Sequence, residues 1–252
     1  CTPMKTGWQA FLCALQFLTL IPVRLAVPPD ERTQARALLF YPLVGGLIGL
    51  CLLLLGTVLQ GVPTGLSAAL LLLVWAGLTG GLHLDGLADS GDGWMGGLGS
   101  RERTLEIMKD PHLGASGALL LMLVLLLKWS ALVALLSVGT LWPLLLAPVA
   151  GRGAALLLLV TTPYARPDGI ARDMLPRLQR QYALWVCAAV ILLLGLFSLW
   201  LALCLLLAGA GLRWLMLRRL GGSTGDTAGA SIELIETLLL VLAVMIGSGG
   251  GG

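Results

Sequence analysis

Long apolar stretches alternate along the chain with short polar segments. A helix needs about 20 predominantly apolar residues to cross a bilayer. Stretches of this kind cover residues 37–60, 64–83, 113–135, 141–162 and 182–217. The last is long enough for two short helices, with a break near residues 195–198. The pattern predicts an all-α fold, a polytopic integral membrane helical bundle with about seven or eight transmembrane helices.

Two further segments are marginal candidates for spans. Residues 7–23 are apolar but end at an Ile-Pro pair, and residues 228–246 carry two glutamates in their first turns. Whether residues 7–23 cross the bilayer or lie along it stays open. We expect residues 1–247 to form a single integral membrane domain and the glycine-rich residues 248–252 to be an appended linker.

The composition supports a membrane protein and excludes several other classes. Hydrophobic residues make up 58% of the chain and charged residues 12%, and the mean hydropathy is +0.94. Soluble domains carry about 25% charged residues, so a soluble enzyme, a disordered chain and a disulfide scaffold are excluded. The five cysteines lie far apart without a CxxC spacing, which is typical of small buried hydrophobes. The net charge of +3, without a densely basic stretch, makes nucleic acid an unexpected partner.

Most of the 16 Lys and Arg residues fall in four polar stretches. These stretches lie around residues 24–36, 101–109, 166–180 and 213–219. An even number of predicted spans separates each pair, so all four can lie on one side of the membrane. The positive-inside rule makes that side the cytoplasm. Most acidic residues fall in the same stretches, so any active-site loops are expected at the cytoplasmic face.

Three aspartates follow the second predicted span. If the helix continues there, Asp85, Asp89 and Asp92 have the spacing i, i+4, i+7 and lie within roughly 60° of one another on one face. Three carboxylates this close repel one another unless a cation neutralises them. Oxygen-only ligands suit Mg²⁺ or Mn²⁺. The alternative is a solvated polar face, but no Lys or Arg lies between Asp85 and Asp92 as such a face would include.

A second charged cluster covers residues 101–114. Glu106 and Asp110 are expected to share a helical face, with Lys109 beside them. Alone, this pattern is typical of an amphipathic helix at the membrane interface, held by i,i+4 pairs. Beside three aspartates, the two acids become candidates for further metal ligands or a base, and Lys109 for a phosphate contact.

A glycine-rich loop opens the last apolar helix. In it, Gly225, Asp226 and Thr227 lie where backbone N–H groups can approach an anion. The loop lacks the lysine of a P-loop and does not indicate an NTPase. A flexible turn is the simpler alternative, with Asp226 as the helix cap.

Arg152 lies inside an apolar span, where an arginine is costly and usually functional. Its expected partner is a phosphate or a carboxylate of the aspartate cluster; snorkelling is the alternative. For Lys128, nearer a span end, snorkelling suffices. His83 is interpreted either as a donor to a carboxylate or substrate, or as a satisfied polar residue at the membrane surface. The arginine-rich residues 163–181 either contact an anionic substrate or anchor the chain at the membrane.

These motifs together resemble the cobalamin synthase family. The matching segments are Gly81–Gly93, Leu105–Asp110 and Gly225–Thr227, supported by Phe17–Val23 and Phe40–Gly45. The similarity extends over essentially the whole chain, and the first two motifs together are specific. Pro111-His112 departs from the Ser-Arg pair common in the family, which puts in doubt a phosphate contact from an arginine there.

The resemblance implies an Mg²⁺-dependent adenosylcobinamide-GDP ribazoletransferase of the bacterial inner membrane, with Mn²⁺ as an alternative ion. It would join adenosylcobinamide-GDP to α-ribazole or α-ribazole 5′-phosphate and release GMP. Membrane lipids would surround it, and a homo-oligomer stays open. Our hypothesis assigns metal binding to Asp85, Asp89 and Asp92, catalysis to Glu106, Lys109, Asp110 and Asp226, and substrate binding to His83, Arg152, Gly225 and Thr227.

Two other classes are weighed against this one. A CDP-alcohol phosphotransferase also uses spaced aspartates in a membrane, but its motif requires an arginine where Asp89 follows Ala88. A transporter would place its charged groups at mid-membrane on repeated halves. Here the acids gather at one face and no internal repeat is visible.

Overall fold

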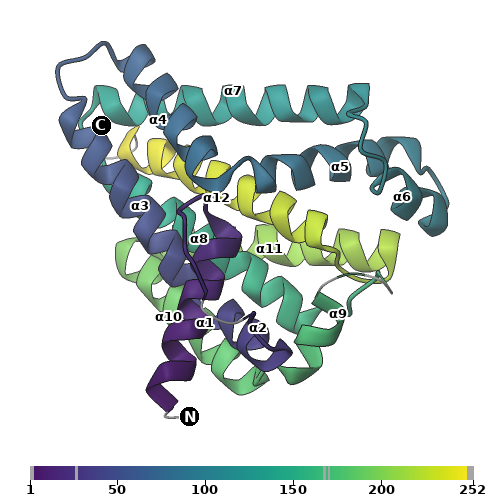
Figure 1. Ribbon diagram of the computed structural model, residues 1–252. Coiled ribbons are helices and arrows are strands. Elements are labelled where there is room, and N and C mark those ends of the chain that lie inside the picture. The colour runs from purple at the N-terminus through teal and green to yellow at the C-terminus, as the bar shows by residue number, and fades with distance from the viewer. Residues whose placement is uncertain (1–2, 26–27, 167–168, 170, 249–252) are drawn as a thin grey trace.

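The computed structural model describes residues 3–25, 28–166, 169 and 171–248, and these residues form helices joined by short loops (Figure 1). Within these ranges no strand forms, and the one β-type pairing is an isolated bridge between Tyr164 and Ser223. Apart from Ser248, the predicted linker lies outside the described residues. The elements are α1 (Pro3–Leu18), α2 (Glu31–Ala37), η1 (Leu38–Phe40), α3 (Tyr41–Val58), α4 (Thr64–Thr79), α5 (Leu82–Gly96), α6 (Arg101–Ile107), α7 (Ala115–Ser137), α8 (Trp142–Thr161), α9 (Ala171–Met174), η2 (Leu175–Arg177), α10 (Arg180–Phe197), α11 (Leu199–Leu220) and α12 (Gly225–Ser248).

The predicted all-α membrane bundle is confirmed. Among the described residues, six helices are long and apolar enough to cross a membrane, and α4 with α5 makes a seventh if this bent pair counts as one span. The count therefore agrees with the lower of the two predicted numbers, seven, if the bent pair is one span. The predicted break in residues 182–217 falls at Ser198, whose hydroxyl caps α11 by accepting a hydrogen bond from the Leu201 N–H at 3.3 Å. Helix α1 has 16 residues and is shorter than the other candidates.

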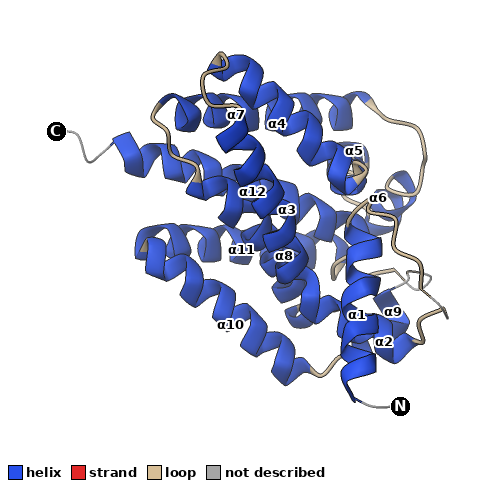
Figure 2. Ribbon diagram, turned by 60° about the vertical axis from the view of Figure 1, so that its left-hand side comes forward, coloured by secondary structure: helices blue, strands red, loops and turns tan. Residues whose placement is uncertain are grey.

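Helices α8 and α12 form the centre of the bundle. In the most apolar 18-residue segment of each helix, 72% of α8 and 61% of α12 is buried, against 22% for α10 and for α11. In Figures 1 and 2, α10 and α11 lie on one side of this centre and α7 with α4 and α5 on the other. Since few residues of α10 and α11 are buried, we expect these helices to face lipid.

A sharp bend turns the chain between α4 and α5. Gly80 and Gly81 have φ angles of 62° and 70°, a left-handed conformation that side chains with a Cβ rarely adopt. The two helices consequently meet at 90°. This bend lays α5 against α7 and α12.

The crossing of α5 and α12 is close enough to require a glycine. A Cβ added at Gly86 would lie 2.8 Å from the carbonyl oxygen of Asp226. Because the two backbones touch here, Asp85 and Asp89 of α5 lie close to Asp226 at the start of α12. Two motifs that are about 140 residues apart in sequence therefore meet in space.

Loop contacts bring the four polar stretches together, as predicted. The polar contacts that join them are Arg166 to the Met108 carbonyl, Arg101 to the Ala165 carbonyl, Arg219 to the Thr104 hydroxyl, and the ion pair of Arg177 with Glu31. All four stretches therefore lie at one end of the bundle. That this end faces the cytoplasm stays a prediction.

Candidate active site

A polar cavity of about 350 Å³ opens where α5, α12 and the loop after α8 meet. Asp85, Asp226 and Arg166 line its charged side. Its other walls are largely apolar and include Phe17, Leu38, Tyr41, Leu159 and Ile232. A second cavity of about 600 Å³, between α1 and the α4–α5 bend, also has Asp85 in its wall. Asp85 therefore borders both spaces.

Helix α5 places the three predicted aspartates on one face. Asp85 is exposed, and Asp89 and Asp92 are partly buried. Asp89 is repelled by the charges of Asp85, Asp226 and Asp92 and attracted by that of Arg166. Asp89 thus interacts with three other carboxylates and one guanidinium, which leaves an excess of negative charge beside the cavity.

Asp92 also has a structural role that the sequence analysis missed. Its two carboxylate oxygens accept hydrogen bonds from the backbone N–H groups of Gly114 and Gly117, both at 2.8 Å. These N–H groups belong to the first turn of α7, so Asp92 ties the end of α5 to the start of α7. A Cβ at either glycine would collide with the Asp92 carboxylate.

Asp226 faces the cavity as an ion-pair partner and is not the cap of α12. Its Oδ2 lies 2.6 Å from Nη2 of Arg166. The capping groups are Thr224 and Thr227: each hydroxyl accepts a hydrogen bond from the other residue's backbone N–H, at 3.2 and 2.8 Å. The capping alternative for Asp226 is therefore wrong.

Of the other residues predicted in this loop, Gly225 lies in the cavity wall and Thr227 does not. Thr227 is 1% exposed and its hydroxyl is used in the cap. Thr227 thus shapes the start of α12 from behind the cavity.

Arg166 and Tyr164 are cavity residues that the sequence analysis did not single out. The loop that carries them is paired to the loop before α12: the Ala165 N–H donates to Ser223 O, and the Ser223 N–H to Pro163 O, both at 2.8 Å. Arg166 also donates to the Met108 carbonyl at 3.0 Å. Burial raises the pKa of Tyr164, so its phenol stays neutral. The one signal in the sequence for this loop was the arginine-rich composition of residues 163–181, which suits contact with an anionic substrate.

The predicted acids of the second cluster lie away from both cavities. Helix α6 ends at Ile107, so the shared helical face predicted for Glu106 and Asp110 is wrong. Glu106 pairs with Arg103 at 2.9 Å and is exposed. Asp110 contacts the backbone N–H and Nδ1 of His112, at 3.0 and 2.6 Å, which lowers its pKa. Neither acid nor Lys109 lines the polar cavity or its neighbour.

With this geometry in place, comparisons with known proteins give the family. A family model described as cobalamin-5-phosphate synthase matches residues 10–244. This chain belongs to the cobalamin-5-phosphate synthase family. It is 53% identical to the adenosylcobinamide-GDP ribazoletransferase of Pseudomonas fluorescens, over 92% of this chain and 97% of that protein. It is 51% identical to the protein of the same name from Stutzerimonas stutzeri, over 94% and 98%. No solved structure gives a significant match.

In this family member a second group of charged side chains is buried between α7, α8 and α12. Nζ of Lys128 lies 2.9 Å from Glu233 and 2.6 Å from Glu236, and Glu236 also pairs with Arg152. Lys128, Arg152 and both glutamates are at most 4% exposed. The partner predicted for Arg152 from the aspartate cluster is therefore wrong, and so is snorkelling of Lys128. His83, 3% exposed, lies beside this group, with Nδ1 3.4 Å from Arg152 Nη2.

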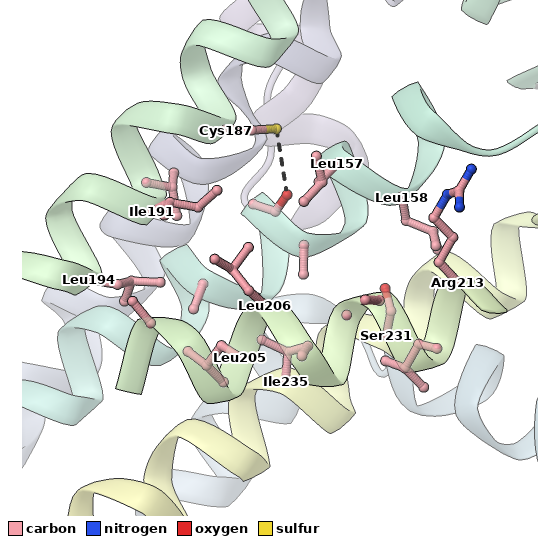
Figure 3. Close-up of a pocket in the computed structure, with 18 of the residues that line it drawn as sticks. Leu157, Leu158, Cys187, Ile191, Leu194, Leu205, Leu206, Arg213, Ser231 and Ile235 are labelled. Carbon is pink, nitrogen blue, oxygen red and sulfur yellow. Dashed lines mark hydrogen bonds between the residues drawn. The ribbon is translucent and has the colours of Figure 1, made fainter. Parts of the chain in front are cut away.

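An apolar cavity of about 310 Å³ lies between α8, α10, α11 and α12 (Figure 3). The one charged residue in its wall is Arg213, whose Nε and Nη2 both donate to the Thr161 carbonyl. Without a carboxylate in its wall, this cavity is no candidate for a metal-dependent site.

The carboxylates at the polar cavity fit a weakly held Mg²⁺ better than a closed metal cage. In the part of the chain that the structure describes, no three His, Cys, Asp or Glu side chains converge on one ion position. Mg²⁺ is usually bound through one or two carboxylates, several waters and the phosphates of a substrate. Asp85 and Asp89 suit this role because no hydrogen bond from another described residue occupies their carboxylate oxygens, whereas backbone N–H groups occupy both oxygens of Asp92.

Proposed function

We propose that this chain catalyses the reaction for which its relatives are named, the transfer of α-ribazole or its 5′-phosphate to adenosylcobinamide-GDP. The observation that carries the proposal is the polar cavity, where Asp85 of α5 meets Asp226 and Arg166. Four of the segments through which the sequence resembles the family contribute residues to its wall, namely Phe17–Val23, Phe40–Gly45, Gly81–Gly93 and Gly225–Thr227. The products are adenosylcobalamin, or its 5′-phosphate, and GMP.

The proposed chemistry is a direct displacement at phosphorus. A ribose hydroxyl of α-ribazole attacks the phosphorus next to the corrinoid, the bond to the bridging oxygen breaks, and GMP leaves with that oxygen. Such a reaction depends mainly on in-line positioning and on neutralising the charge of the diphosphate. Arg166, held by Asp226 and the Met108 carbonyl, is the guanidinium best placed for the diphosphate.

The hydroxyl proton needs an acceptor, and Asp226 is our first candidate because it lines the cavity. Glu106 and Asp110 remain weaker candidates, since they pair with Arg103 and His112 instead. Lys109 is our candidate for a second phosphate contact, because it follows Met108, whose carbonyl oxygen accepts from Arg166.

We assign Asp85 and Asp89 as ligands of Mg²⁺, for which Mn²⁺ could substitute, with Asp92 adding negative charge from the next turn. When bound, the ion would neutralise the diphosphate and the leaving GMP. The apolar walls of the cavity suit the base of α-ribazole, and its volume is in the range of small-molecule sites. The corrinoid would remain outside, on the cytoplasmic side of the inner membrane.

The test is product formation by the full chain in liposomes. Adenosylcobinamide-GDP is supplied with α-ribazole or its 5′-phosphate, in Mg²⁺ or in EDTA, and corrinoid and GMP are followed by mass spectrometry. Equimolar cobalamin and GMP, formed only with Mg²⁺, are expected. Well-folded protein that forms no product with either ribazole would refute the proposal.

A further inference from the structure

The imidazole of His83 connects the buried charges to the polar cavity. His83 is in the first turn of α5 and is one of the residues that line the polar cavity. On the other side, its Nδ1 lies 3.4 Å from Nη2 of Arg152. One ring therefore borders both regions.

The contact with Arg152 determines which ring nitrogen carries the proton. A guanidinium can only donate hydrogen bonds, so Nδ1 of His83 must be the acceptor. An imidazole whose Nδ1 accepts carries its proton on Nε2. Nε2 makes no hydrogen bond to any described residue, and it is not among the fully buried side-chain atoms that lack a partner. Nε2 is therefore accessible and not fully buried. Its N–H is thus left for a group in the cavity.

The surrounding helices hold Arg152 in this orientation. One oxygen of Glu236 accepts from Arg152 and the other from Lys128, which is also bound to Glu233. The close approach of α8 to α12 depends on Gly151, where a Cβ would lie 2.9 Å from Cγ of Glu236. On α12, a Cβ at Gly229 would lie 3.4 Å from Cα of His83, so the first turn of α5 rests on the same helix.

We propose that Arg152 fixes His83 as the neutral tautomer with its proton on Nε2, and that this N–H donates a hydrogen bond to an oxygen of the substrate in the polar cavity. His83 is then a substrate-binding residue, and Arg152 and Glu236 are positioning residues. The acceptor is a phosphate or ribose oxygen, since these are the oxygen groups of α-ribazole, of its 5′-phosphate and of the diphosphate that reacts with them. The tautomer stands independently of the reaction, whereas the donation to substrate rests on the proposed function.

The first test observes the tautomer directly. The chain has two histidines, so the exposed His112 is changed (His112→Gln) and the protein is purified without a histidine tag. Its ¹⁵N-histidine spectrum then reports His83 alone. We expect a protonated Nε2 and an unprotonated Nδ1, and in Arg152→Met an averaged mixture of tautomers. A protonated Nδ1 in the His112→Gln protein would overturn the proposal, whether or not any product is formed.

The second test separates the two ring nitrogens by activity. The side-chain amide of His83→Gln reaches the position of Nε2, and that of His83→Asn reaches only Nδ1. We expect His83→Asn to raise KM for the ribazole substrate about tenfold, the effect of one lost hydrogen bond to a charged or polar group. His83→Gln should stay within about threefold of the unchanged protein.

Equal KM values for the two variants, whether normal or raised, would show that Nε2 does not donate to substrate. Extraction as a monodisperse species in detergent verifies that both variants are folded. If the unchanged protein forms no product, the proposed function fails, and the spectrum still decides the tautomer.

Discussion

Two clusters of charged side chains both include residues of α12 but differ in their charge balance. Beside the polar cavity, Asp89 is repelled by three other aspartates and attracted by Arg166, which is paired with Asp226. In the buried cluster, Lys128 and Arg152 are matched by Glu233 and Glu236. The balanced cluster satisfies its own charges, so it can hold helices together without a ligand. The unbalanced cluster is left with negative charge that a cation from outside can neutralise.

The difference follows from access to water. Charges inside a membrane bundle must be paired, because each unpaired group there is costly. The polar cavity is lined in part by residues from the polar end of the bundle, such as Arg166, so excess charge is tolerated there. Under the proposed function, charge balance therefore separates the cluster that binds substrate from the cluster that holds the helices together.

The largest effect is expected from Asp89→Asn. Removing this carboxylate should lower the rate of product formation about 10³-fold or more, or roughly 4 kcal/mol, because metal-dependent charge neutralisation is lost. The thermal midpoint should stay the same or rise, since Asp89 is repelled by three neighbouring aspartates. Mass spectrometry of the corrinoid and thermal unfolding in detergent measure the two quantities.

The matched control is Asp173→Asn, an exposed aspartate of α9 outside the cavity wall. It should keep normal activity. If Asp89→Asn and Asp173→Asn are equally active, the aspartate cluster is not the active site.

Glu236→Gln should have the opposite profile, with loss of stability as its main effect. It leaves Arg152 and Lys128 with one buried carboxylate between them, at an expected cost of about 3 kcal/mol. Thermal unfolding in detergent should show the lower midpoint.

Adding Lys128→Met restores the charge balance in the double variant, Lys128→Met with Glu236→Gln. We expect this variant to recover part of the lost stability, as coupled neighbours do. Strictly additive losses would mean that charge balance does not hold the buried cluster together.

Gly86→Ala is expected to lower the free energy of unfolding by about 1–3 kcal/mol, a smaller effect. The added methyl group would press on the Asp226 carbonyl and separate α5 from α12. Product formation should fall with it, because Asp85 and Asp226 move apart. Gly77→Ala in α4 is the control: nothing lies within 4 Å of its added Cβ, so it should be neutral or slightly stabilising. Similar unfolding midpoints for the two variants would contradict the close crossing.

The smallest effect is expected from Glu106→Gln. Glu106 is exposed and paired only with Arg103, and such surface pairs contribute little. Its rate of product formation should change less than threefold, against a much larger loss for Asp226→Asn. A Glu106→Gln variant as inactive as Asp226→Asn would place the base on α6 instead of α12.

Local patterns in the sequence were sufficient for the helices and for one face of the site. The spacing of Asp85, Asp89 and Asp92 predicted their shared helical face. The break in the apolar stretch near Ser198 predicted two separate helices. Both features depend only on residues a few positions apart.

Partners far apart in the chain could not be predicted. Glu236 follows Arg152 by 84 positions, and Lys128 precedes Glu236 by 108, so no spacing rule connects them. The helical boundary at Ile107 was missed because the polar residues continue past it. The capping role of Asp92 was missed because its partners are backbone groups of another helix.

The most direct test of the unbalanced cluster as the active site is the rate of GMP release at increasing Mg²⁺ concentration, measured in liposomes for the unchanged protein and for Asp89→Asn. We predict no release from the unchanged protein in EDTA, a rate that saturates with Mg²⁺, and a rate near background for Asp89→Asn at the same concentrations. Equal rates with Mg²⁺ and with EDTA, or an Asp89→Asn protein with the same Mg²⁺ dependence as the unchanged one, would contradict that assignment.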